Sequence, residues 1–169
     1  MTTEMFEKMS PSQIIASCNQ QDDKEIWRNA VDFLTYRQEL PELSSEELIT
    51  LAIKSALDDE FLFYLKRHPG RLGVSELAKL AKFHPNPWFR NAIANMAVEK
   101  VSGKDQILQL ALDCDHPVTW SKLFDDSFDD SITRNLIQSN FDKISMTNRG
   151  RSYLKAFKFS PIAVPCPVN

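Results

Sequence analysis

The sequence predicts an all-α protein of about ten short helices. Apolar residues recur every three or four positions through most of the 169 residues, for example at Leu48, Leu51 and Ala52, and this is the spacing of one helix face. The chain has only four glycines, too few for an all-β protein with many tight turns. Prolines and glycines fall between the periodic segments, where they interrupt helices.

The first part of the chain predicts three helices. Ser10 before Pro11 is the pattern of an N-cap residue followed by a first-turn proline. Ser44 with Glu47 three residues later is the pattern of a capping box. Between these two signals an apolar stripe begins at Ile26. The expected helices are 11–18, 23–38 and 44–57.

Helix-breaking prolines and glycines separate four predicted helices in the middle of the chain. Pro69-Gly70 ends one of them, and Gly103 precedes another. Asn86 before Pro87 predicts a capped helix start like the one at Ser10. The expected helices are 59–67, 74–83, 87–99 and 103–113.

The last part of the chain predicts three helices and a tail, the first helix opening at Pro117. The acidic run from Asp125 to Asp130 lacks the glycine and the distal glutamate of an EF-hand loop, so we interpret it as a capping loop rather than a calcium site. Three prolines within residues 160–169 prevent a helix there and predict an extended or disordered tail. The expected helices are 117–124, 129–140 and 149–158.

Two short patterns recur about once per helix pair. One is a large apolar residue followed by alanine, as in Leu51-Ala52 and Leu80-Ala81. The other is an Arg-Asn pair followed by two apolar residues near the start of a helix. A period of this length is typical of stacked helix pairs. The Arg-Asn pairs are Arg28-Asn29, Arg90-Asn91 and Arg134-Asn135.

The stretch LAKLAKFHPNPWFRNAIANM, from Leu77 to Met96, resembles one unit of a HEAT-type or leucine-rich-variant α-helical repeat. The resemblance implies a short right-handed α-solenoid of helix pairs, in a single repeat domain over residues 1–159. The second unit departs from the pattern, because residues 61–64 read Phe-Leu-Phe-Tyr where an arginine is expected. A non-repetitive helical bundle remains the alternative.

The formal net charge is only −3, but the charged residues are grouped into blocks of opposite sign along the sequence. Residues 61–104 carry eight basic and two acidic side chains, whereas residues 1–60 carry five basic and thirteen acidic ones. Strong local charge of this kind can steer a charged partner. The sequence shows neither a membrane-length apolar run nor a signal-peptide pattern, and three cysteines at unrelated spacings suit reduced thiols, so a cytoplasmic protein is expected.

Tryptophan and basic residues near the starts of helices suggest a protein-binding surface, because Trp and Arg dominate binding hot spots. We therefore expect a non-enzymatic protein-interaction module, either an adaptor or an inhibitor of the immunity-protein type. The alternative interpretation buries the three indoles in the core. The candidate binding residues are Trp27, Arg28, Trp88, Arg90, Trp120, Lys122 and Arg134.

Two other functions stay open. Basic residues interleaved with aromatic ones in 149–158, together with segment 61–104, suggest nucleic-acid binding. A metal-dependent enzyme is less well supported. The three histidines each precede a proline, as corner residues between helices do, and the cluster Asp113 to His116 has no second cluster of ligands to complete a metal site. No cofactor or metal is therefore expected. The candidate nucleic-acid-binding residues are Arg149, Arg151, Lys155 and Lys158.

Overall fold

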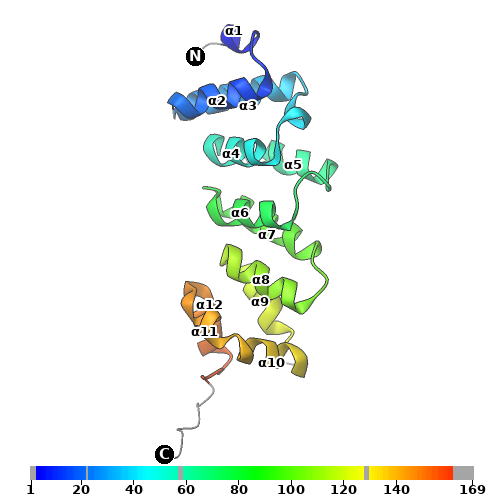
Figure 1. Cartoon of the computed structure of the whole chain (residues 1–169), viewed down its shortest axis with the longest axis vertical. Helices are drawn as coiled ribbons and strands as arrows, with labels where there is room; N and C mark the ends of the chain where they lie inside the picture. Colours follow the sequence, from blue (N-terminus) through cyan, green and yellow to red (C-terminus); the bar gives the residue numbers. More distant parts are fainter. Residues whose placement is uncertain (1–2, 22, 57–58, 128–129, 162–169) are drawn as a thin grey trace, which may run out of the picture. The chain divides into compact units, whose positions relative to one another are not determined.

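The computed structural model of the chain describes residues 3–21, 23–56, 59–127 and 130–161 (Figure 1). Within these ranges every regular element is helical, namely twelve α-helices and one short 3-10 helix, which confirms the all-α class. The chain divides into two compact units, residues 1–93 and residues 94–169. Of the predicted tail, only Ser160 and Pro161 lie within the described residues.

The first unit consists of helices that pack in the order of the sequence. Its elements are α1 (Thr3–Phe6), α2 (Pro11–Gln21), α3 (Lys24–Tyr36), η1 (Leu40–Glu42), α4 (Ser45–Ser55), α5 (Asp59–Arg67), α6 (Val74–Phe83) and the first half of α7 (Pro87–Glu99). Helix α3 packs against α2 and α4, while α4 also packs against α2 and α6. The rings of Phe61 in α5 and Phe89 in α7 lie 6.2 Å apart. Contacts therefore join neighbouring helices and also every second helix.

Apart from α1 and η1, which the sequence did not predict, the helices of this unit begin within one residue of the predicted starts. The Glu47 N–H donates to Ser44 Oγ at 3.2 Å, and the Ser44 N–H donates to Glu47 Oε2 at 2.7 Å, which is the expected capping box. The hydrogen bond from the Ser44 N–H is the main cause of the lowered pKa of Glu47. The Trp88 N–H donates to Asn86 Oδ1 at 2.9 Å at the start of α7, as the Asn-Pro pattern predicts.

The second unit contains the second half of α7 followed by α8 (Lys104–Cys114), α9 (Pro117–Asp125), α10 (Ser131–Ser139), α11 (Phe141–Met146) and α12 (Asn148–Ala156). Helix α8 packs against α9 and α10, and α12 packs against α9 and α11. The core of the unit gathers around Trp120 and Phe124, with Leu154 and Phe159 supplied by the C-terminal segment. The rings of Phe124 and Phe159 meet edge to face, 5.7 Å apart.

The predicted helix 129–140 is followed by a separate short helix, α11, that the sequence did not predict. The bend falls at Asn140, whose backbone leaves the helical region with φ −110° and ψ 17°. Its side-chain Nδ2 donates to the Leu136 carbonyl at 2.9 Å, and its backbone N–H donates to the same carbonyl at 3.2 Å, so both groups of Asn140 cap the end of α10. The turn brings Ile144 and Leu154 into the core of the second unit.

The Arg-Asn pairs occupy equivalent positions on α3, α7 and α10. The residue before each arginine is buried, and so is the residue four positions further on, which lies on the same face of the helix. The three asparagines are exposed. The first buried set is Trp27, Phe89 and Thr133, and the second is Val31, Ile93 and Ile137. The repeated pattern thus marks one buried face on each of three helices.

Across the described part of the chain, no helix is long and apolar enough to cross a membrane.

Candidate binding site

A pocket of about 550 Å³ lies in the first unit, between the end of α3, η1 and α5. This volume is within the usual range for ligand pockets, which is about 300–1,000 Å³. Most of its lining is apolar or aromatic, with polar groups from both walls. It is lined by Thr35, Gln38, Leu40, Pro41, Glu60, Phe61, Phe63, Tyr64, Arg67 and His68.

One wall of the pocket is created by the way α3 ends. Gln38 has φ 58°, and its N–H donates to the Thr35 carbonyl at 3.1 Å. The Glu39 N–H donates to the Leu34 carbonyl at 2.9 Å, so the helix ends in a Schellman motif with Gln38 in the left-handed position. This motif reverses the chain and directs it into η1, where Leu40 is buried and Pro41 faces the pocket.

The other wall is α5, which has two different apolar faces. Phe61, Leu62 and Leu65 are buried and hold the helix in the unit. Phe63 points to the other side and is 57% exposed, while Tyr64 is half-buried. The Tyr64 and His68 rings are 4.7 Å apart, as expected for side chains one helical turn apart. An aromatic surface therefore extends from the core to the rim of the pocket.

The two ends of α5 give the pocket opposite charges. Glu60 lies in the first turn, and Arg67 lies in the last turn beside His68. Seven residues separate Glu60 from Arg67, which is about 10 Å along a helix. The Arg67 Cζ lies 4.4 Å from the centre of the Phe63 ring, in a cation–π contact. Within the described residues Arg67 has no ion pair with a carboxylate.

The three tryptophans do not form the expected row of exposed anchors. Trp27 is 1% exposed and Trp120 is 0% exposed, because both rings lie on the buried faces of α3 and α9. Trp88 is 56% exposed, because Phe89 takes the buried position next to the arginine in α7. The Trp120 Nε1–H donates to Asp115 Oδ1 at 2.7 Å. Of the three tryptophans, only Trp88 is exposed.

The four basic residues among the predicted binding residues have different surroundings. Arg28 is exposed on α3, and Arg90 is half-buried on α7 with no hydrogen-bond partner for its Nε. Lys122 is exposed and donates to Asp126 at 3.3 Å. The Arg134 Cζ lies 4.8 Å from the centre of the Phe159 ring, at the edge of the core. Lys122 and Arg134 thus have structural contacts of their own.

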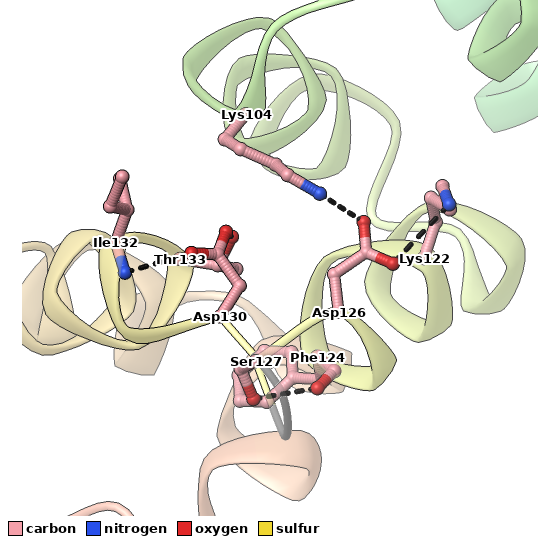
Figure 2. Close-up of polar contacts among 8 residues, drawn as sticks. All are labelled: Lys104, Lys122, Phe124, Asp126, Ser127, Asp130, Ile132 and Thr133. Atoms are coloured by element: carbon pink, nitrogen blue, oxygen red, sulfur yellow. Dashed lines mark hydrogen bonds and ion pairs between the residues drawn. The ribbon is translucent and has the colours of Figure 1, made fainter.

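The acidic run before α10 acts as a cap and as an acceptor of lysine hydrogen bonds (Figure 2). Asp130 accepts the Ile132 N–H at 3.0 Å and the Thr133 hydroxyl, so it is the N-cap of α10, as predicted for this loop. Asp126 accepts from Lys104 of α8 and from Lys122 of α9. The Lys104 hydrogen bond is the main cause of the lowered pKa of Asp126. Part of the run, residues 128–129, lies outside the described residues.

The basic residues of the last helix remain open to solvent. Arg149, Arg151, Lys155 and Lys158 are all exposed, and none forms an ion pair with a carboxylate within the described residues. Lys158 has φ 59°, and the Phe159 N–H donates to the Leu154 carbonyl at 2.9 Å, so Lys158 also ends α12 in a left-handed cap.

Two of the three histidines form local caps. His84 is buried, and its Nδ1 accepts the Asn86 N–H at 3.2 Å. His116 Nδ1 accepts the Val118 N–H at 3.3 Å at the start of α9. Both contacts agree with a corner role for the His-Pro pairs. His68 instead lies exposed at the pocket.

The cluster from Asp113 to His116 is held by contacts within the protein. Cys114 is buried, with its Sγ 3.5 Å from Thr119 Oγ1, and burial raises the pKa of this thiol. Asp115 accepts from the Trp120 indole and from the backbone N–H of Arg149. In the part of the chain that the structure describes, no group of three or more His, Cys, Asp or Glu side chains is arranged to hold a metal ion.

No protein-family model, no curated protein and no solved structure matches this chain. The HEAT-like resemblance therefore depends on the internal repeat alone.

The pocket residues were not among the sequence candidates, although a signal for them was present. Residues 61–64 depart from the repeat pattern, with Phe63 and Tyr64 in place of the expected arginine. Those two aromatic residues line the pocket.

Proposed function

We propose that this protein is a non-enzymatic protein-interaction module built as a short α-solenoid. Two observations support the solenoid. Helices of the first unit contact both their neighbours and the helix two positions away, and the Arg-Asn pattern marks the same buried face on three helices. Stacked helix pairs of this type present extended surfaces that vary without disturbing the core.

The observation that supports partner binding is the exposure of large aromatic side chains in the first unit. Tyr36, Phe63, Phe83 and Trp88 are each more than half exposed, and they come from four different helices. Exposed aromatic residues are typical of the anchors of protein–protein interfaces. Both an adaptor and an inhibitor of the immunity-protein type would use such anchors.

The test is affinity purification of the tagged full-length chain at physiological salt from the cells that produce it. We expect a stoichiometric protein partner that is lost from the double variant Phe83→Ala, Trp88→Ala. Because both side chains are exposed, the double variant should keep its helical circular dichroism spectrum. The matched control is Ile132→Ala, which removes an exposed apolar side chain from the second unit. Failure to recover any stoichiometric protein, or equal recovery by all three forms, would contradict the proposal.

A second candidate function, nucleic-acid binding, is favoured by one observation only. The four exposed basic residues of segment 149–158 have no carboxylate partner among the described residues. Phosphate contacts made by such residues weaken steeply with salt. The double variant Arg151→Gln, Lys155→Gln should reduce the salt dependence of binding to a mixed-sequence RNA or DNA. Absence of any retarded complex at low salt would remove this candidate.

A further inference from the structure

We infer that the pocket between α3, η1 and α5 binds an acidic peptide segment of the partner, with an apolar side chain in the pocket and a carboxylate on Arg67. This inference depends on the proposed protein-interaction function and names the chemistry of the partner.

The apolar part of the site is formed by residues from both walls. Leu40 and Pro41 come from η1, while Phe61 and Phe63 come from α5. The pocket has space for one or two large side chains and is open at the surface, where Phe63 is exposed. Short peptide motifs commonly bind by placing such apolar anchors in a groove between helices. Thr35 and Gln38 add polar groups beside the apolar surface.

Arg67 is positioned to receive a carboxylate. Its guanidinium is stacked on the Phe63 ring, so one face of the group is covered by an aromatic surface. Stacking leaves the N–H donors at the edge of the guanidinium, where they can form the paired hydrogen bonds that carboxylates accept. No carboxylate within the described residues forms an ion pair with it. A group from another molecule can therefore take this position.

The neighbouring charges favour an acidic ligand at this end of the pocket. Glu39, which follows the α3 wall, is already paired with Arg37 at 2.8 Å. Lys66 is exposed next to Arg67, so two positive charges lie at this end of α5. Glu60 lies at the opposite end of α5. An acidic residue of a bound peptide is thus attracted to the Arg67 end and repelled from the Glu60 end.

The test measures binding of a labelled, end-capped tetrapeptide that has a leucine–phenylalanine pair at one end and two glutamates at the other, so that the glutamates can reach Arg67 without approaching Glu60. We compare it by fluorescence anisotropy with the same peptide carrying glutamines in place of glutamates. We expect the acidic peptide to bind the full-length protein about tenfold or more tightly than the neutral one. Absence of binding by the acidic peptide, or equal binding by both peptides, would overturn the inference.

Two variants separate a specific contact from general attraction. Arg67→Gln should reduce the affinity for the acidic peptide to that of the neutral one. Lys66→Gln removes the same charge from the same helix but does not line the pocket, so it should change the affinity by less than about twofold. Equal losses in both variants would show non-specific electrostatic attraction and overturn the inference.

Two further outcomes test which molecule occupies the pocket. Self-association of the protein that the acidic peptide disrupts would assign the pocket to a second copy of the chain instead. In the purification experiment above, loss of the partner from Arg67→Gln and not from Lys66→Gln is expected. If Arg67→Gln retains the partner, the pocket does not bind it, but the protein still acts as an interaction module. The two proposals can therefore be contradicted independently.

Discussion

Replacing Asp115, a half-buried residue at the end of α8, by alanine should strongly destabilise the second unit. Asp115 has φ 45° and ψ 44° and ends α8 in the left-handed conformation. Its Oδ1 accepts the indole N–H of Trp120 at 2.7 Å, and the Arg149 N–H in the first turn of α12 lies 3.3 Å from the same oxygen. One carboxylate therefore connects three helices of the unit.

The magnitude follows from three separate effects. Loss of the acceptor leaves the indole N–H of the fully buried Trp120 without a partner, at a cost of about 1–3 kcal/mol. Removing a negative charge that accepts a hydrogen bond from the first turn of α12 costs about 0.3–1 kcal/mol. Alanine also tolerates the left-handed conformation less well than aspartate does. We expect Asp115→Ala to lower the free energy of unfolding by about 2–4 kcal/mol.

The assay is urea unfolding followed by far-ultraviolet circular dichroism, with two matched variants. Asp115→Asn keeps an acceptor for the indole and tolerates the same backbone conformation, so it should cost less than about 1 kcal/mol. Asp115→Gly removes the side chain but also the backbone strain, so it should be more stable than Asp115→Ala by about 1 kcal/mol. A cost below about 0.5 kcal/mol for Asp115→Ala, or equal costs for the alanine and asparagine variants, would refute this reasoning.

Three further predictions concern packing and titration. Gly150→Ala should lower the free energy of unfolding in urea by about 1–3 kcal/mol, because the added Cβ would lie 2.6 Å from a backbone carbonyl oxygen. The control Gly70→Ala adds a Cβ that meets nothing within 4 Å, so it should be neutral or slightly stabilising. Similar costs for the two variants would contradict the tight packing around Gly150. Burial raises the pKa of the Cys18 thiol to about 11. The free energy of unfolding should therefore fall as pH rises above about 9, because the thiol of the unfolded chain ionises there while the buried thiol stays protonated. The native thiol should also react slowly with a disulfide reagent. A stability that is flat up to pH 10.5 in wild type and in Cys18→Ala alike would exclude that effect. The pKa of Asp126 is lowered from its ordinary value of 3.8, so Asp126→Asn should cost at most about 1 kcal/mol at pH 7. This difference from wild type should shrink as pH falls below 3.8, where the carboxylate of the unfolded chain becomes protonated first; a pH-independent difference would show another cause.

Local signals in the sequence predicted most of the fold. Ser44 with Glu47 forms the expected capping box, and Asn86 caps α7. Such signals succeed because a cap involves residues two or three positions apart, so the chain itself brings the two groups together. The bend at Asn140 had no comparable signal, because its effect depends on the packing of α11 and α12 in the core.

The candidate site was predicted less well, because burial depends on which face a helix turns toward its neighbours. Trp27 and Trp88 look alike in the sequence, since each lies near the start of a helix and one or two residues before an Arg-Asn pair. The structure buries Trp27 and exposes Trp88, because Phe89 fills the equivalent position in α7. Aligning the two helices on the Arg-Asn pair would have distinguished them.

The sequence by itself determined the all-α class, the order of the main helices and their caps, because each depends on residues within one or two turns of each other. Only the tertiary structure decided which aromatic side chains are exposed and that a pocket exists. The pocket joins Gln38 and Pro41 to Phe63 and Arg67, which are more than 20 residues away in the sequence. Such a site forms only when the left-handed cap at the end of α3 directs η1 toward the exposed face of α5. No local sequence pattern predicts that these two segments come into contact.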